Sequence, residues 1–124
     1  GAYEYVASYV NNGHTNLASY GASLVNSSGN LKQVYSKGSS DSSEPNYQAN
    51  KGRYGDAVYE TSTNGSSSNG SWYGDYSLFP SASYPFFSRG GGYGFGSAAG
   101  AFDFRSGAGS SSSDIGFRPV LATN

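Results

Sequence analysis

The 124-residue chain contains neither cysteine nor methionine, which excludes disulfides, zinc sites built on thiolates and thiol chemistry. It is also poor in aliphatic side chains, since valine, isoleucine and leucine together number 12. No stretch approaches the ~20 apolar residues of a transmembrane helix, so we expect no membrane insertion. The seven basic residues are scattered and face eight acidic ones. Because phosphate tracking requires clustered lysine and arginine, this distribution argues against a nucleic-acid partner.

Small and aromatic residues are abundant instead. Glycine, serine and proline make up 48 residues, about 39% of the chain, a level at which low-complexity disorder is a competing interpretation. Two features oppose disorder: the net charge is only −1, and 20 residues are aromatic, each able to bury a large area. We therefore expect one folded domain over residues 1–124, of α+β class and loop-rich, with a mostly aromatic core and sparse secondary structure.

Four residue types dominate the chain. Tyrosine, serine, glycine and asparagine supply 66 residues, about 53%. This is the composition of antibody-type binding loops, in which rigid tyrosine anchors stand among small adaptable polar residues. Any loop-rich surface protein also uses serine, glycine and asparagine for its turns. Composition alone leaves both interpretations open.

The local patterns predict few regular elements. Residues 1–10 are aromatic and β-branched in the manner of a strand, which the Asn-Asn-Gly of residues 11–13 ends. Residues 17–25 have the spacing of a short helix or an irregular packed segment. Further expectations are a loop over residues 36–50, where Pro45 forbids a central strand, a short strand or helical turn at 54–61, an exposed loop tip at 63–71, an extended aromatic-rich crossing of the core at 72–87 and a last strand at 116–121.

Three short motifs occur along the chain. Residues 1–6 read GAYEYV, residues 89–91 read RGG and residues 114–121 read DIGFRPVL. In this order they resemble the Gly-Asn-Val-Trp-Glu-Trp, Arg-Gly-Gly and Gly-Phe-Arg signatures of the formylglycine-generating-enzyme (sulfatase-modifying-factor) type of C-type lectin fold. The longer ending is similar to that of variable proteins diversified by retroelements and of related bacterial surface and prophage tail proteins. The residues that carry the resemblance are Glu4, Arg89, Gly90, Gly91, Gly116, Phe117 and Arg118.

The resemblance implies a C-type-lectin-like fold in which residues 88–121 display the ligand-contacting positions on a fixed scaffold. The enzymes of this family oxidise a substrate with active-site cysteines that hold copper. This chain has no cysteine, so that activity is not carried over and we expect no enzyme. In the family the first motif lies well inside the domain, whereas here it begins at residue 1. The resemblance therefore implies that the N-terminal part of the fold is missing, and that another chain or fragment completes it or the piece packs differently.

The scaffold residues also have a direct physical interpretation. Gly90 and Gly91 permit backbone conformations that are closed to other residues. Arg89 and Arg118 are suited to bind loop carbonyls or a buried carboxylate, and Glu4 is the expected partner of one of them.

The candidate ligand-binding residues lie between the last two motifs. Glycine and alanine around them would leave their side chains projecting, with aromatic faces for sugars, peptides or aromatic side chains and charged groups for hydrogen bonds. In the alternative interpretation Phe102 and Phe104 face the core while Asp103 and Arg105 pair on the solvent side of a strand. The binding residues expected are Tyr93, Phe95, Asp103, Arg105 and Ser106.

Other chemistry has weaker support. His14, the only histidine, follows a turn sequence, and no nucleophile elbow accompanies it. The glycine-rich residues 90–96 lack the Lys-Ser/Thr of a phosphate loop. The acidic residues have no calcium-loop spacing, so we expect no metal and no cofactor, although some C-type lectin folds bind calcium. Three Asn-x-Ser sequences match the glycan acceptor pattern, which is common by chance.

Together these patterns predict an extracellular recognition module, located on a bacterial cell surface or a virion tail, that binds a protein or carbohydrate receptor. Its adhesion would rest on many weak sites displayed together. The principal alternative is a self-assembling structural subunit of a surface filament or phage tail fibre, whose partners are other copies of the chain or its own missing N-terminal segment. A second alternative is an enzyme of the resembled type that has exchanged its chemistry for another.

Overall fold

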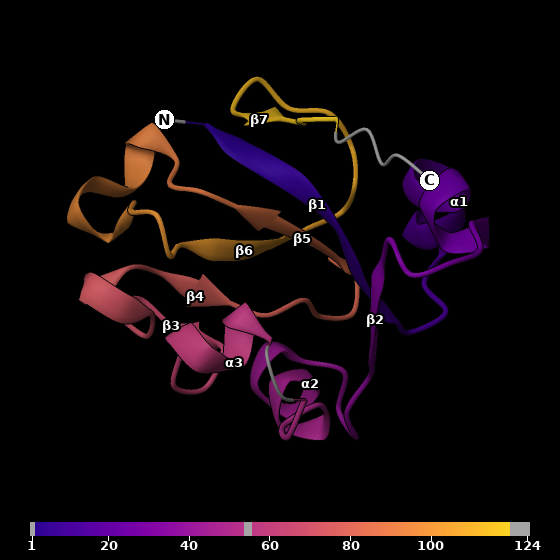
Figure 1. The fold of residues 1–124 in the computed structure, drawn as a ribbon, viewed down its shortest axis with the longest axis horizontal. Coiled ribbons are helices and arrows are strands. Elements are labelled where there is room, and N and C mark those ends of the chain that lie inside the picture. Colours follow the sequence, from indigo (N-terminus) through magenta and orange to yellow (C-terminus); the bar gives the residue numbers. More distant parts are fainter. Residues whose placement is uncertain (1, 54–55, 120–124) are drawn as a thin grey trace.

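The computed structural model describes residues 2–53 and 56–119, which fold into a curled sheet with a few short helices (Figure 1). Its strands are β1 (Tyr3–Asn11), β2 (Gln33–Ser36), β3 (Ser66–Ser67), β4 (Ser77–Leu78), β5 (Phe86–Arg89), β6 (Phe104–Gly107) and β7 (Ile115–Gly116). Its helices are α1 (Thr15–Asn26), α2 (Ser43–Ala49) and α3 (Ala57–Thr61), and the 3-10 turns are η1 (Trp72–Gly74) and η2 (Tyr93–Ala98). The α+β class expected from the sequence is confirmed.

The sheet is organised around β1. Strand β5 runs antiparallel along one edge of β1, with Glu4 opposite Arg89. Strands β2 and β7 both run parallel to β1 and share its other edge, β7 beside Tyr3 and Glu4 and β2 beside residues 8–11. Beyond β5 follow β6, β4 and β3. The first and last described strands therefore lie side by side, and Figure 1 shows β7 above β1.

The core is mostly aromatic, as the composition predicts. Of the eleven buried hydrophobic residues in the described part of the chain, eight are tyrosine or phenylalanine. Phe79 is fully buried, and the rings of Phe87 and Tyr35 pack edge-on against it with centroids 5.0 and 5.2 Å away. Each such ring contributes about 1.5–3 kcal/mol on burial, which offsets the shortage of aliphatic side chains. A second cluster under α1 consists of Tyr9, Leu17 and Phe86.

The first two predicted elements are present. The strand expected at residues 1–10 is β1, and Gly13 follows it with a φ of 76°, a conformation that favours glycine. The helix expected at residues 17–25 is α1. His14 caps this helix, because its Nδ1 accepts a hydrogen bond of 3.1 Å from the backbone N–H of Asn16. The only histidine of the chain therefore has a structural role at a helix start.

Residues 36–50 were expected to form a loop, and this prediction is wrong because they contain α2. Pro45 lies in the first turn of that helix, where its missing N–H would have had no partner within the helix. The segment at 54–61 yields the short helix α3, whose start Asp56 caps by accepting from the N–H of Val58. Residues 54 and 55 lie outside the described part of the chain.

The later segments agree with the prediction only in part. The expected loop tip at 63–71 contains β3, which pairs with β4. Of the expected aromatic crossing at 72–87, Trp72 and Tyr73 in η1 lie at the surface, and buried side chains begin at Asp75. The expected strand at 116–121 is confined to β7 at Ile115–Gly116, and residues 120–121 are not among those described.

A network around Asn46 holds α2 to the rest of the molecule. Its fully buried amide accepts from the N–H of Gly38 at 2.6 Å. The same amide donates to Asp41 Oδ1 at 2.8 Å and to the carbonyl of Pro80 at 2.9 Å. One side chain thus joins segments that are 34 residues apart in the sequence.

Asn46→Ala is expected to lower the free energy of unfolding by about 2 kcal/mol, because the buried groups it leaves behind lose their hydrogen bonds. Urea denaturation of the chain measures the change. Gln48→Ala, at an exposed position of the same helix, is the matched control and should change stability by less than about 0.5 kcal/mol. Equal effects from the two substitutions would contradict a structural role for the Asn46 network.

Candidate functional site

The side chain of Arg105, in β6, lies among aromatic rings that come from three separate stretches of the chain. Its guanidinium carbon is 3.3 Å from the ring centroid of Phe95, 3.8 Å from that of Tyr76 and 5.4 Å from that of Tyr3. Only 14% of the side chain is exposed. A desolvated cation over aromatic faces is held by a substantial cation–π attraction. Arg105 therefore fixes η2, which contains Phe95, against the sheet.

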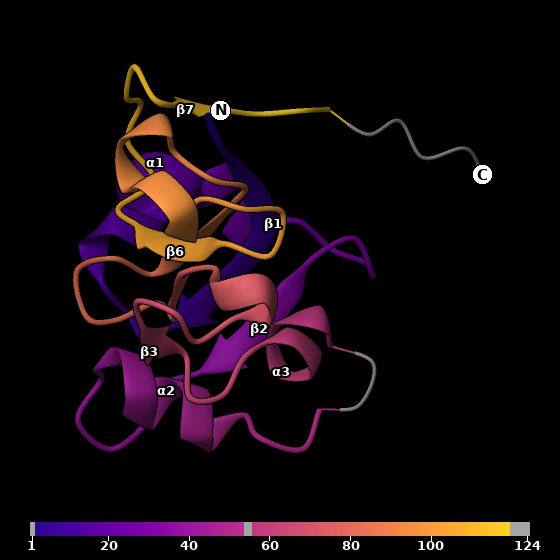
Figure 2. The same cartoon turned by 90° about the vertical axis from the view of Figure 1, so that its left-hand side faces the viewer.

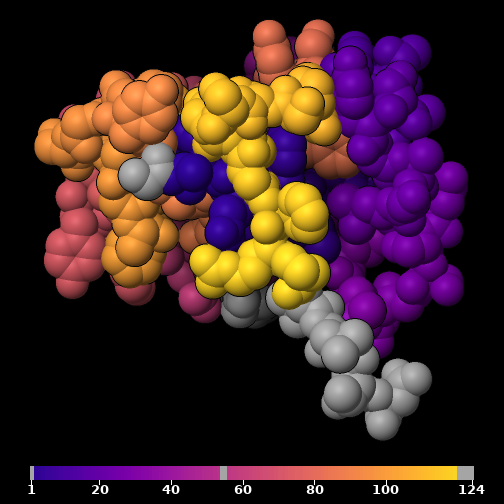
Figure 3. All heavy atoms as spheres, turned by 90° about the horizontal axis from the view of Figure 1, so that it is seen from above, coloured from indigo at the N-terminus to yellow at the C-terminus, as the bar shows by residue number. Residues whose placement is uncertain are grey.

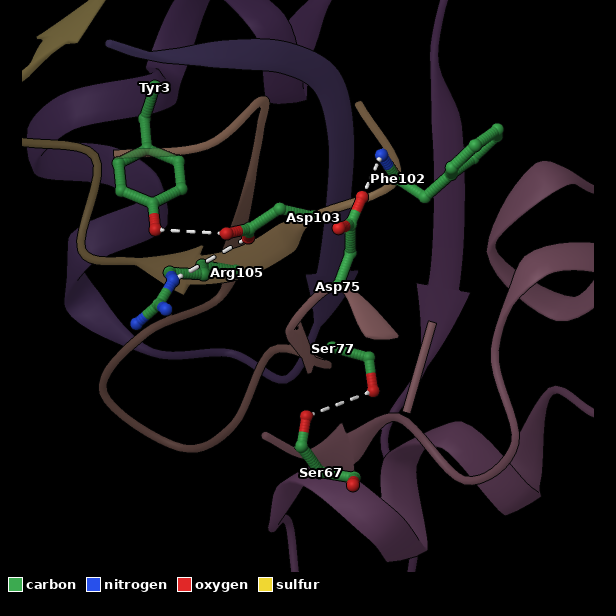
Figure 4. Close-up of polar contacts among 7 residues, drawn as sticks. All are labelled: Tyr3, Ser67, Asp75, Ser77, Phe102, Asp103 and Arg105. Atoms are coloured by element: carbon green, nitrogen blue, oxygen red, sulfur yellow. Dashed lines mark hydrogen bonds and ion pairs between the residues drawn. The ribbon is translucent and has the colours of Figure 1, made fainter. Parts of the chain in front are cut away.

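Asp103 lies beneath this cation and is fully buried. Its Oδ2 accepts a hydrogen bond of 3.2 Å from the Tyr3 hydroxyl, and its Oδ1 is 3.5 Å from Arg105 Nε (Figure 4). Burial raises the pKa of Asp103 to about 6, although Arg105 and the Tyr3 hydroxyl act in the opposite direction. Burial likewise raises the pKa of Tyr3 to about 12. Asp103 and Arg105 therefore form a buried ion pair at the base of η2, and their 3.5 Å separation is longer than a hydrogen bond.

A second buried carboxylate, Asp75, joins the neighbouring loops. Its Oδ2 accepts a hydrogen bond of 2.8 Å from the backbone N–H of Phe102, as Figure 4 shows. A side chain at Gly100 would collide with the Asp75 carboxylate, so the close approach requires glycine there. The next residue, Tyr76, donates its N–H to the carbonyl of Ala98 at 2.9 Å. The segment between η1 and β4 is therefore joined to η2 and to the turn that follows η2.

Five exposed or partly exposed aromatic side chains lie on the segments that these contacts join, and we call them the aromatic face. Figure 1 places η1 and η2, which carry four of them, at the same end of the molecule, and Figure 2 views that end directly. The side chains are largely open to solvent, with exposed fractions of 53% for Trp72, 90% for Tyr73, 81% for Tyr93 and 44% for Phe95. The aromatic face consists of Trp72, Tyr73, Tyr93, Phe95 and Phe102.

The rings of η1 meet the fifth ring at short range. Tyr73 stacks on Phe102 with centroids 5.7 Å apart and planes inclined by 20°. Trp72 meets Phe102 edge-on at 5.3 Å. Phe102 is itself only half-buried, so the three rings form one continuous surface. Offset stacked and edge-on pairs are the favourable arrangements for aromatic side chains.

The structure separates the five predicted binding residues. Tyr93 and Phe95 lie on the aromatic face. Arg105 supports that face from below, and Ser106 lies further along β6, opposite Phe87 of β5 and half-buried. Asp103 does not reach the surface, so the expectation that it projects into solvent is wrong.

The expected alternation of residues 102–105 fails for a simple reason. Strand β6 begins at Phe104, so Phe102 and Asp103 precede it and do not follow the side-chain alternation of a strand. Phe102 turns outward and Asp103 inward, while Phe104 is buried as predicted.

Trp72 and Tyr73 were not predicted as surface residues. Their aromatic character suggested the core, whereas the turn residues around them are the signal of a loop. Asn69-Gly70 precedes the pair and Gly74 follows it with a φ of 77°. Tyr73 also has a positive φ, 61°, which is uncommon for a large side chain.

The scaffold motifs have the following partners. Arg118 pairs with Glu4 at 3.1 Å, which confirms the expected partner, but the pair is exposed, so the expectation of a buried carboxylate is wrong. The guanidinium of Arg89 lies 5.9 Å from the Phe104 ring, and burial lowers the pKa of Arg89; among the described hydrogen bonds none joins it to a carbonyl or a carboxylate. Gly90 has a φ of 86°. A side chain at Gly91 would collide with the backbone of Ala99, so both glycines are needed where they stand.

A cavity of about 430 Å³ lies apart from the aromatic face, between α1 and strands β1 and β5. Tyr5, Tyr20 and Phe86 are among its lining residues. Figure 3 looks down on this side of the molecule, where atoms of β1 are visible between the C-terminal segment and α1.

Residues 2–53 and 56–119 contain no group of three or more histidine, aspartate or glutamate side chains arranged to hold a metal. No helix among the described residues is long and apolar enough to span a membrane.

Comparison with known proteins adds no assignment, because the chain matches no family model, no curated protein and no solved structure.

Proposed function

We propose that the chain is a non-enzymatic recognition module of C-type-lectin-like fold that binds a receptor through its aromatic face. Its place is the outside of a bacterial cell or a virion tail, and its ligand is a protein or carbohydrate on a cell surface. The observation that carries the proposal is the exposure of these rings, four of which belong to η1 and η2 at one end of the fold (Figure 2). The sequence resemblance, with its display region at residues 88–121, supports the same end, because Tyr93, Phe95 and Phe102 belong to that region.

Exposed aromatic side chains of this number are costly for a protein that has no use for them. Large apolar patches at a surface mark binding sites or aggregation liabilities. Here the rings rest on a fixed base of Arg105, Asp103 and Asp75, each of which joins separate stretches of the chain. A surface ordered before binding loses little conformational entropy when the ligand arrives, which raises its affinity. Binding of this kind needs no cofactor and little movement of the scaffold.

The proposal is tested by screening the tagged chain on arrays of glycans and of cell-surface proteins. The wild type is expected to bind a defined class of ligand, and the double variant Trp72→Ala/Tyr93→Ala is expected to lose that binding. Tyr84→Ala is the matched control, because this ring is also half-exposed but follows Ser83, whose carbonyl bonds to Asn16 of α1. Binding that survives the double substitution, or is lost equally in the control, would overturn the assignment of the site.

A structural subunit remains the second candidate, and the sheet edge at β7 favours it. Among the strands that the structure describes, β7 pairs only with β1, and Phe117 beside it is 80% exposed. An unpaired strand edge is a template for adding a strand from another chain. Sedimentation and electron microscopy of the purified chain would reveal rings or filaments in that case, whereas a monomer at all concentrations would exclude self-assembly.

A further inference from the structure

The backbone of Tyr73 is held in the left-handed region, with φ 61° and ψ 20°. A large L side chain rarely adopts this conformation, and persistent backbone outliers point to functional sites. Core packing does not account for it here, because the ring of Tyr73 is 90% exposed. The conformation instead presents the ring at the surface with one face against Phe102 and the other face free.

The loop that carries Tyr73 is fixed by short-range hydrogen bonds. The N–H of Ser71 donates to the carbonyl of Asp75 at 2.9 Å, and the N–H of Gly74 donates to the carbonyl of Ser71 at 3.2 Å. The amide of Asn69 donates to the carbonyls of Ser68 and Gly74, 2.9 Å from each, in the orientation that satisfies both groups. These hydrogen bonds hold the turn that presents Tyr73 in a fixed conformation.

The surroundings of the three joined rings, Trp72, Tyr73 and Phe102, are polar but uncharged. The exposed residues directly before η1 and from the end of η2 to Phe102 are serine, asparagine, glycine and alanine. The two nearby carboxylates, Asp75 and Asp103, are buried and engaged in the contacts described above. A ligand here would meet aromatic faces, hydroxyl groups and an amide, without an opposing charge.

From this geometry we infer that Trp72, Tyr73 and Phe102 form a binding site for a neutral pyranose sugar within a glycan, an inference that rests on the proposed recognition function. The face of an aromatic ring carries negative charge density, which attracts the weakly positive C–H groups on the apolar face of a pyranose. The sugar hydroxyl groups at the rim would meet the uncharged polar residues of these loops, of which Ser68, Asn69 and Ser97 are exposed. Phosphorylated, sulfated or sialylated ligands find no cation among the exposed residues of these loops.

The size of the three-ring surface agrees with a small ligand. An aromatic side chain buries roughly 150–250 Å² when it is fully covered, so these partly exposed rings offer less than the ~800 Å² that each partner contributes to a stable protein complex. One or two sugar units match such an area. Weak binding of single units becomes useful when many copies are displayed together.

Trp72 is the only tryptophan of the chain, so its fluorescence reports on this site directly. The experiment titrates the chain with neutral oligosaccharides of glucose, galactose and N-acetylglucosamine, with sialylated and sulfated glycans as charged comparisons. We expect at least one neutral oligosaccharide to change the Trp72 emission saturably at concentrations up to the order of 10 mM. The absence of any saturable change, or a change with charged glycans alone, would overturn the inference.

The variants locate the effect on the rings. Tyr73→Gly removes the ring while suiting the backbone conformation, and it is expected to weaken sugar binding by about tenfold with an unchanged unfolding midpoint. Tyr73→Asn, which also tolerates this conformation, replaces it if the glycine variant is unstable. Tyr84→Ala is the control and retains binding. Sugar binding that persists at full strength in the Tyr73 variants would place the sugar elsewhere and refute this site.

Failure of the sugar inference differs from failure of the recognition function. If the array screen finds a protein ligand that Trp72→Ala/Tyr93→Ala abolishes while no neutral sugar changes the emission, the recognition function stands and the sugar inference is wrong. If neither array shows binding, both are wrong.

Discussion

Arg105→Ala is expected to lower the free energy of unfolding by about 3–5 kcal/mol at neutral pH. The substitution removes the cation beside the fully buried carboxyl group of Asp103. It also removes the group against which the rings of Phe95 and Tyr76 pack. Leaving one member of a buried ion pair without its partner is among the most destabilising single changes. Chemical denaturation of wild type and variant measures the difference.

Arg118→Ala is the matched control, because it also breaks an arginine–carboxylate pair. The Arg118 side chain is 78% exposed and pairs with a partly exposed Glu4, so its loss should cost less than about 1 kcal/mol. The double substitution Asp103→Leu/Arg105→Met replaces the buried pair with apolar groups and should recover much of the stability lost in Arg105→Ala. Comparable losses in Arg105→Ala and Arg118→Ala would show that burial does not govern the strength of these pairs.

The elements that the sequence predicts correctly are those with local signals. The strand β1 has aromatic and β-branched residues and ends at an Asn-Gly turn, and α1 has apolar residues at helical spacing. The pairing of Glu4 with Arg118 spans 114 residues, yet the sequence resemblance brought both motifs to attention. For β1 and α1, whose patterns lie within one stretch of chain, the residues of that stretch were sufficient to predict the element.

The errors concern residues whose positions depend on distant partners. Helix α2 is short and polar, and the buried Asn46 that anchors it contacts Pro80, far away in the sequence; short helices are stabilised by tertiary packing more than by propensity. Asp103 is charged and therefore predicted at the surface, but Tyr3 and Arg105 receive it in the interior. Trp72 and Tyr73 are aromatic and therefore predicted in the core, but a tight turn directs them outward.

The stability of the fold is expected to fall as the pH rises from about 4 to about 6. The pKa of Asp103 is raised from 3.8 to about 6 by burial, so between these values the folded chain binds more protons at this site than the unfolded chain does. The stabilisation that comes from the protonated carboxyl group is present below pH 4 and is lost as the pH passes through 6. A shift of this size corresponds to roughly 3 kcal/mol. Urea denaturation at a series of pH values measures the profile.

Asp103→Asn is expected to flatten this profile, because an amide does not titrate. Carbon NMR of the Asp103 carboxyl group offers a second measurement and should show a midpoint near 6 in the wild type. In Arg105→Ala the midpoint should rise further, since the arginine is the largest influence that lowers the pKa of Asp103. The loss of stability in Arg105→Ala should therefore shrink as the pH falls and Asp103 becomes neutral. If Asp103→Asn leaves the profile unchanged, the pH dependence of the stability comes from another group and not from Asp103.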